Sequence, residues 1–162
     1  MIPFAEDINY WRTSKSADAR WVEKAKQQIE EAGGRVLGDG FGSDATTGQS
    51  AYMLAFELNG VPYKITWPVL PTKTKKPDII LAARVQAATM LYRDIKARCV
   101  TAKVLGTRSA FFSYLLLPNG STATELAVPE LVDQIPELLR TVPALPSGET
   151  VEGSWEERPN DA

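Results

Sequence analysis

Apolar and polar residues alternate over residues 51–68, "AYMLAFELNGVPYKITWP", in the manner typical of a β-hairpin. The central Asn59-Gly60 dipeptide favours the positive φ angles of a two-residue type I′ turn, which pairs Leu58 with Val61. This register predicts one face of apolar and aromatic side chains: Tyr52, Leu54, Phe56, Leu58, Val61, Tyr63, Ile65 and Trp67. The opposite face is mixed and is expected to be the wetter of the two: Met53, Ala55, Glu57, Pro62, Lys64 and Thr66.

Helical periodicity appears on both sides of this hairpin. Residues 17–32 have an apolar residue every three or four positions, with Ser16 as the expected N-cap and Gly33-Gly34 as the stop. A longer helix is predicted from Pro77 or Asp78 to about Leu105. Its apolar stripe would cover the sheet: Leu81, Ala88, Leu91, Tyr92, Ile95, Cys99 and Ala102.

The segments between and after these elements are less regular. A short strand is expected at 35–38, and the following "GDGFGSDATTGQS" is interpreted as a flexible hairpin loop, since no Gly-Lys-Ser/Thr follows to make a phosphate loop. Beyond 107 we expect a short helical turn, an apolar strand-like stretch with a turn at 118–120, and an amphipathic helix at 129–140.

Together these elements predict an α+β fold. Its antiparallel sheet has three or four strands and helices packed on one face, in the order α-β-β-β-α plus a C-terminal helix. Residues 1–142 are expected to form a single domain. Residues 143–162 are rich in Pro, Gly, Ser and Glu and are expected to form a disordered acidic tail.

Composition excludes several kinds of chemistry. The 162 residues include no histidine and one cysteine, which removes histidine-based nucleophilic catalysis, histidine metal sites and cysteine zinc clusters. The carboxylates are scattered and show no metal-loop spacing, so we expect no enzyme activity, no catalytic residue, no bound metal and no cofactor. No apolar run is long enough to cross a bilayer and the N-terminus lacks signal-peptide features, so no membrane partner and a cytoplasmic location are expected.

Charge is unevenly distributed although the net charge is only −2. Residues 60–110 contain ten basic residues and two acids, whereas residues 147–162 contain five acids and one arginine. A basic surface that contacts nucleic-acid phosphates is therefore a hypothesis for the middle of the chain, against the alternative of an ordinary solvated loop and helix. The candidate residues are Lys73, Lys75, Lys76, Arg84, Arg93, Lys96 and Lys103.

Arg84 differs from the other candidates because it falls within the apolar stripe of the long helix. A charge there has to extend to solvent, pair with an acid such as Glu57, or point into a binding groove. Aromatic side chains beside a basic groove would stack on unpaired bases. Trp67 and Tyr92, with Trp11, are candidates for this role, although a place in the core is the alternative for each.

The function expected from these patterns is non-catalytic nucleic-acid binding, to single-stranded DNA first, through the basic loop and the long helix. The alternative is an accessory protein that acts by protein–protein interaction and docks through the polar face of the sheet or through the acidic tail, "EGSWEERPND". The tail could instead only solubilise the protein, or compete with phosphates for the basic segment. The choice of DNA or RNA is open at this point.

Three resemblances bear on these expectations. The junction "TKTKKPDIILAARVQAATML" resembles the last-helix junction of the double-stranded-RNA-binding domain, which implies phosphate contacts by Lys73, Lys75 and Lys76, although Pro77 separates these lysines from the helix. The hairpin and long helix resemble phage single-strand annealing proteins, which implies a basic groove and a homo-oligomer. The stretch "ARVQAATMLYRDIKARCVTAKVLGTRSAFFSYLLLPNGSTATE" is similar to small uncharacterised phage and prophage proteins and implies a phage origin.

Overall fold

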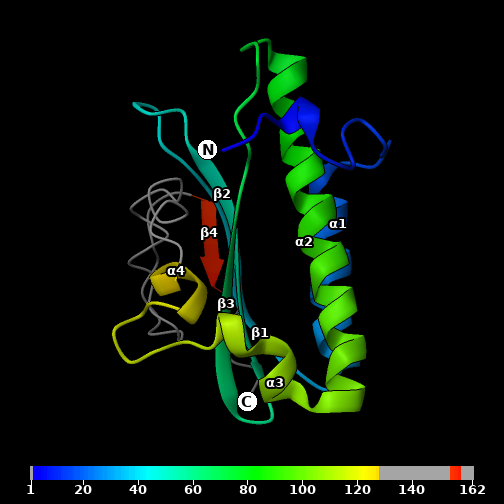
Figure 1. The fold of residues 1–162 in the computed structure, drawn as a ribbon, viewed down its shortest axis with the longest axis vertical. Coiled ribbons are helices and arrows are strands. Elements are labelled where there is room, and N and C mark those ends of the chain that lie inside the picture. The colour runs from blue at the N-terminus through cyan, green and yellow to red at the C-terminus, as the bar shows by residue number, and fades with distance from the viewer. Residues whose placement is uncertain (1, 128–153, 158–162) are drawn as a thin grey trace.

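The computed structural model describes residues 2–127 and the backbone of residues 154–157. A short 3-10 turn η1 (Ala5–Asp7) precedes α1 (Asp18–Glu31), and three strands follow, β1 (Arg35–Ser43), β2 (Ser50–Leu58) and β3 (Val61–Pro68). The long helix α2 (Pro77–Leu105) leads into α3 (Thr107–Phe111), η2 (Phe112–Tyr114) and α4 (Ala123–Ala127). Strand β4 (Ser154–Glu157) completes an antiparallel sheet (Figure 1), whose strand order is β3-β2-β1-β4. The α+β class, the strand direction and the helix-strands-helix order are confirmed.

The β2–β3 hairpin has the expected register. Asn59 and Gly60 have φ angles of 52° and 76°, as a type I′ turn requires. Leu58 pairs with Val61, and the pairing continues to Tyr52 with Trp67. The local sequence therefore sets both the turn and the face that the hairpin turns toward the helices.

Strand β1 is longer than predicted, because the glycine-rich "GDGFG" belongs to the strand and not to a loop. It pairs with β2 as far as Ser43 with Ser50, after a bulge between Val36 and Gly38. Only residues 44–49 form the connection, where the Asp44 Oδ1 atom accepts hydrogen bonds from the backbone N–H groups of Thr46 and Thr47 at 2.8 and 3.2 Å. These bonds lower the pKa of Asp44.

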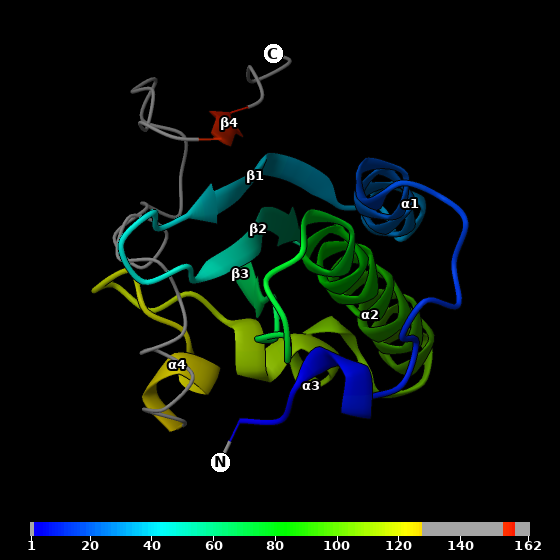
Figure 2. The ribbon, with the colours of Figure 1, turned by 90° about the horizontal axis from the view of Figure 1, so that it is seen from above.

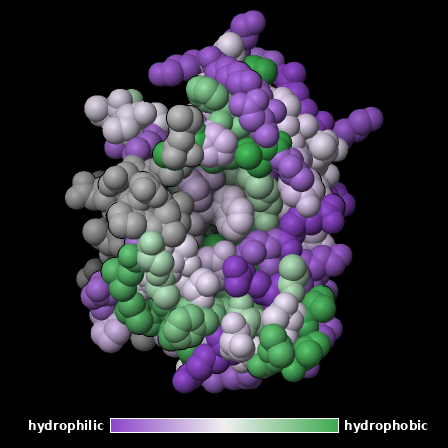
Figure 3. All heavy atoms as spheres, in the orientation of Figure 1, coloured by the Kyte–Doolittle hydropathy of each residue, from purple (hydrophilic) through white to green (hydrophobic). Residues whose placement is uncertain are grey.

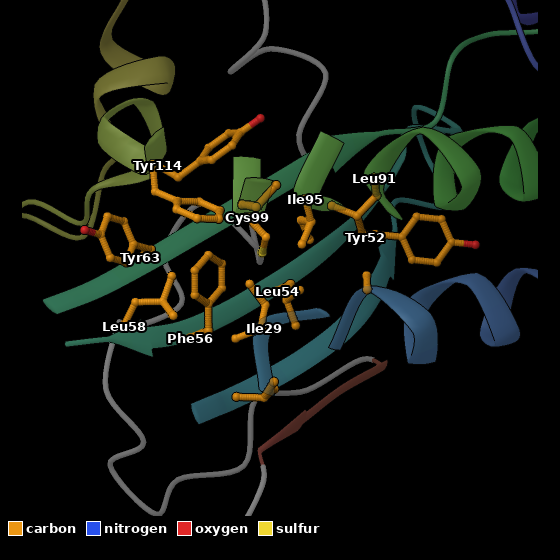
Figure 4. Packing of buried hydrophobic residues seen from close by; sticks show 14 of the residues in the cluster. Ile29, Tyr52, Leu54, Phe56, Leu58, Tyr63, Leu91, Ile95, Cys99 and Tyr114 are labelled. Carbon is orange, nitrogen blue, oxygen red and sulfur yellow. The ribbon is translucent and has the colours of Figure 1, made fainter. Parts of the chain in front are cut away.

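Helices α1 and α2 form one layer over the sheet (Figure 2), and the contacts between them show that they run in the same direction. Trp21 of α1 meets Tyr92 of α2, and Gln28 meets Cys99, so the same step of seven residues on each helix leads to the next contact. The core lies between this layer and the sheet. Figure 4 shows part of it, including Ile29, Leu54, Phe56, Leu91, Ile95 and Cys99.

The sequence predicted the end of α1 correctly but not the residue that caps its start. Ala17, not Ser16, is the N-cap, and no side chain caps this end. The stop is as predicted: Gly33 has a φ of 86°, and a Cβ on Gly34 would lie 2.6 Å from Leu58 Cδ2. Glycine is therefore needed at both positions.

The second face of the sheet is buried, so the prediction that it is the wetter face is wrong. Met53 and Ala55 are each 1% exposed, and Lys64 is completely buried. Helix α4 packs here, and its Glu125 Oε1 atom lies 3.4 Å from Lys64 Nζ, which also donates a 3.0 Å hydrogen bond to the Gly120 carbonyl. A charge is tolerated on this face because the buried Glu125 carboxylate and the Gly120 carbonyl both pair with the ammonium group.

Helix α4 begins with a reciprocal pair of capping hydrogen bonds that we did not predict. The Thr122 hydroxyl accepts from the Glu125 backbone N–H at 3.3 Å, and the Glu125 Oε2 atom accepts from the Thr122 N–H at 3.0 Å. The expected turn at 118–120 precedes it, with the Gly120 N–H donating to the Leu117 carbonyl at 2.9 Å.

The predicted helix at 129–140 lies outside the described residues. Of the predicted tail, 143–162, the structure describes only 154–157, whose backbone pairs with β1 from Gly38 with Glu157 to Phe41 with Ser154. The domain limits therefore stay a prediction.

Candidate nucleic-acid interface

Two aromatic rings lie together on the outer side of the helix layer. The ring centroids of Trp21 and Tyr92 are 5.3 Å apart with the planes tilted by 44°, and both side chains are half-buried. The Trp21 indole N–H donates a 2.8 Å hydrogen bond to the Ser14 hydroxyl oxygen, which fixes the ring in place. Both side chains pack against the core and remain partly exposed.

Three cationic groups surround these rings. Lys24 Nζ lies 4.5 Å from the Trp21 ring centroid, Lys96 Nζ lies 5.9 Å from that of Tyr92, and the Arg93 guanidinium lies 5.9 Å from both. All are within range of a cation–π contact. We call Trp21, Lys24, Tyr92, Arg93 and Lys96 the aromatic–cation patch.

Lys103 extends the positive charge along the same side of α2. It follows Lys96 by seven residues, almost two turns, so both side chains leave the helix in nearly the same direction. Arg93, Lys96 and Lys103 are all exposed, whereas Arg98 turns inward and pairs with Asp94 at 2.9 Å.

Burial and the nearby Asp94 carboxylate raise the pKa of Tyr114, which donates a 2.8 Å hydrogen bond to that carboxylate.

A strained backbone segment lies beside the patch. We call residues 4–13 the N-terminal strap. Gln86 of α2 holds it, because its buried side-chain amide donates to the carbonyls of Ala5, Ile8 and Asn9 at 2.8, 3.2 and 3.0 Å. Tyr10 has a φ of 68° and lies 5.8 Å from the Arg93 guanidinium. A bulky residue in the left-handed region is costly and is found mostly where function requires it.

The three loop lysines occupy a different place. Lys73 Nζ lies 2.7 Å from the Asp7 carboxylate, and this hydrogen bond raises the pKa of Lys73. Lys75 and Lys76 are exposed. From Lys76 to Arg93 the helix rises by about 25 Å, so the loop and the patch are separate positive surfaces unless a ligand bridges them.

Arg84 lies on the sheet side of α2, about 180° around the helix from Arg93. Its guanidinium stacks on the Phe41 ring, 4.6 Å from the centroid. The buried Nε atom has no hydrogen-bond partner among the described residues, and Glu57 pairs with Arg35 instead, at 3.7 Å. Pairing with Glu57, one of the three alternatives for Arg84, is therefore not what the structure shows, and Arg84 does not share a surface with the patch.

The stacking candidates divide in the same way. Tyr92 belongs to the patch. Trp67 packs against the core on the sheet face under α2. This is the alternative that was given for Trp67, a place in the core in place of base stacking. Trp11 is half-buried within the N-terminal strap, with the Arg12 guanidinium 5.8 Å from its ring.

Three residues at this site were not predicted from the sequence: Trp21, Lys24 and Tyr10. Trp21 precedes Ala25 and Ile29 by four and eight residues, so helical spacing could have placed it at the border of the buried stripe. No local pattern brings Tyr10 to Arg93, because that contact depends on the fold of the strap.

Within residues 2–127 and 154–157, no three His, Cys, Asp or Glu side chains gather in a way that could hold a metal ion. Among the described helices, none combines the length and the apolar character that a bilayer crossing needs. Comparison of the chain with protein-family models, with curated proteins and with solved structures gave no match.

Proposed function

We propose that the protein binds nucleic acid without catalysis, preferring single-stranded DNA, and that the aromatic–cation patch is the principal contact. The observation that carries this proposal is the Trp21–Tyr92 pair with three cations close to its rings. Exposed rings that stack on bases, beside cations that contact phosphates, are the usual parts of a single-strand site.

The rings favour a single strand over a duplex. A base in a duplex is stacked on both sides and offers no free face, whereas an unpaired base offers its full π surface to Trp21 or Tyr92. The rings are also held before any ligand arrives, by Ser14 and by the packing of α1 on α2. Less conformational freedom is then lost on binding.

The cations supply attraction that does not depend on sequence. Lys24, Arg93 and Lys96 lie in the patch, and Lys103 lies about 15 Å further along α2 than Arg93. Lys75 and Lys76 would add contacts only for a strand long enough to reach the start of the helix. Affinity should therefore fall with salt and rise with strand length.

The test is a salt titration of binding, followed by fluorescence anisotropy, with labelled oligothymidylate, duplex DNA, single-stranded RNA and duplex RNA. With about four phosphate contacts, the slope of log affinity against log salt for a single strand should be about −3. Arg108→Ala, which removes an exposed charge on α3, is the matched control and should leave the slope unchanged. Absence of binding near 50 mM salt, or equal binding of duplexes, would refute the proposal.

A second candidate function, docking to a protein partner, draws on another part of the surface. Val104, Leu105 and Phe112 are 78%, 65% and 59% exposed where α2 ends and η2 begins. Figure 3 shows hydrophobic residues at the lower edge, where α2 ends in Figure 1. Large exposed apolar residues close together often mark contact sites. If a partner or a second copy binds there, Leu105→Glu should abolish the complex in light scattering and leave single-strand binding intact.

A further inference from the structure

A cavity of about 480 Å³ opens between the N-terminal strap, the start of α1 and the first turns of α2. Leu81, Ala82 and Val85 of α2 form an apolar wall. The charged residues of the lining are two cations and two acids: Arg12, Lys15, Asp18 and Asp78. Its volume lies in the range of small-molecule sites, which combine an apolar surface with a few polar groups. A nucleotide likewise combines a flat apolar ring, its base, with an anion, its phosphate.

The cavity adjoins the aromatic–cation patch directly. Ser14 lines the cavity and accepts the hydrogen bond from the Trp21 indole at 2.8 Å. On α2, Val85 in the cavity wall precedes Tyr92 in the patch by seven residues, so both face the same side about 10 Å apart. The cavity and the patch are therefore neighbours along α2, at a separation that one strand can span.

The strap that borders the cavity is strained at two residues. Tyr10 and Arg12 have φ angles of 68° and 54°. Tyr10 lies beside Arg93 of the patch, and Arg12 lines the cavity. Left-handed backbone at non-glycine residues is costly, and here it occurs where the two surfaces meet.

Arg12 is free to exchange its partner. It pairs with Asp78 at 3.1 Å, but the two side chains are 51% and 68% exposed. An ion pair this exposed contributes little, so a phosphate can take the place of the carboxylate on the guanidinium.

From these four observations we infer that the cavity is a nucleotide subsite. It takes one unpaired nucleotide of the strand bound on the patch, with the base against Leu81 and Val85 and the phosphate on Arg12. Asp78 then acts as a competitor of that phosphate. This inference rests on the proposed function, since it concerns a strand that the patch already holds.

The first test fills the cavity. Ala82→Phe should weaken binding of a twelve-residue oligothymidylate about tenfold, because one base loses its apolar contacts with Leu81 and Val85, and should leave the salt slope unchanged. Thr101→Phe adds a ring of the same size at an exposed position near the other end of α2 and should bind like the unsubstituted protein. If Ala82→Phe also binds like the unsubstituted protein, the subsite is refuted while the proposed function stands. If the unsubstituted protein does not bind, both are overturned.

The second test does not depend on tolerance of a new ring. Arg12→Gln should weaken single-strand binding and lower the magnitude of the salt slope by about 0.7, whereas Asp78→Asn should strengthen binding. A purely structural ion pair would make both substitutions act in the same direction. Equal effects of the two variants, or no effect of either, would overturn the assignment of the phosphate to Arg12.

Discussion

Trp21 of α1 and Tyr92 of α2 meet with ring centroids 5.3 Å apart, and the contact between Gln28 and Cys99 repeats one step of seven residues later on both helices. The ring pair is thus part of the regular packing between two helices that run in the same direction. Its geometry is set by the packing of α1 on α2 and by the hydrogen bond from the Trp21 indole to Ser14, and not by the cations around it. The rings and the cations therefore make separable contributions that can be tested one at a time.

Removing one ring should reduce affinity without changing the dependence on salt. We expect Tyr92→Leu or Trp21→Leu to lower the affinity for single-stranded DNA by about 1–3 kcal/mol, since a base loses its stacking partner. The salt slope should stay the same because no cation is lost. Phe112→Leu, at an aromatic residue that is 59% exposed outside the patch, is the control. A changed slope with unchanged affinity would contradict the assigned roles.

The loop lysines should matter only for long strands. Changing Lys73, Lys75 and Lys76 together to Ala should weaken binding of an oligonucleotide of about 20 residues, because such a strand can span the roughly 25 Å from the patch to the loop. A strand of about six residues should be unaffected. Arg93→Ala with Lys96→Ala should weaken both. Loss of short-strand binding in the loop variant would show that the loop is the primary site.

The buried pair of Lys64 and Glu125 should be intolerant of losing one partner. Glu125→Ala leaves the completely buried Lys64 ammonium without its carboxylate and removes a capping bond of α4, so we expect a loss of about 3–5 kcal/mol in the free energy of unfolding. Lys64→Met combined with Glu125→Gln should recover most of this loss, because no charge then stays buried. Urea denaturation measures both. A loss below about 1 kcal/mol for Glu125→Ala would mean that water reaches the lysine.

Stability should fall at high pH through Tyr52. Burial, and the 2.6 Å hydrogen bond that its hydroxyl donates to the Asp18 carboxylate, raise the pKa of Tyr52 well above its ordinary value. Above about pH 10 the unfolded chain releases this proton whereas the folded protein keeps it, so the free energy of unfolding decreases as pH rises. The full contribution of Tyr52 to stability is present only below about pH 10. The slope from one such group is at most about 1.4 kcal/mol per pH unit.

Tyr52→Phe should flatten this decrease. Urea denaturation at several pH values from about 8.5 to 11 compares the two proteins within the window opened by the unfolded-state pKa of about 10. Tyr114, whose pKa burial and Asp94 also raise, gives the unsubstituted protein a further decrease that Tyr52→Phe does not remove. Parallel curves for the two proteins would contradict the role of Tyr52.

Arg84 should contribute little to the stability of the fold and little to the binding of single strands. Arg84→Met removes a buried Nε without a partner but also a cation–π contact with Phe41, two effects of opposite sign and similar size. We expect the free energy of unfolding to change by less than about 1 kcal/mol. Single-strand affinity should be unchanged because Arg84 faces away from the patch. A tenfold loss of affinity would place Arg84 in the binding site.

Local patterns were sufficient where one segment determines its own structure. The Asn59-Gly60 turn and the alternation around it set the register of β2 and β3, and Pro77 begins α2 as expected. They failed for "GDGFG", because glycines typical of loops continue β1 once β2 supplies hydrogen bonds on one side and β4 on the other. Tertiary pairing there overrides local preference.

The candidate site was harder to predict from the sequence because its residues come from segments that lie far apart along the chain. Sequence alone located Tyr92, Arg93 and Lys96, which share one helix. It missed Trp21 and Lys24, which join them only through the packing of α1 on α2, and Tyr10, which Gln86 holds in place through carbonyls up to 81 residues away. The burial of the second face of the sheet was not predicted for the same reason, because α4, which packs on that face, lies far from the hairpin along the sequence.

The shared direction of α1 and α2 also has a consequence for how the chain acquires its fold. Antiparallel neighbours can pack as soon as a short turn joins them, but Gln28 has to wait for Cys99, 71 residues later. During synthesis the apolar side of α1 therefore emerges well before its partner and stays exposed until the whole sheet and most of α2 have been made. Contacts of such long range predict slower folding than that of a helical bundle of similar size.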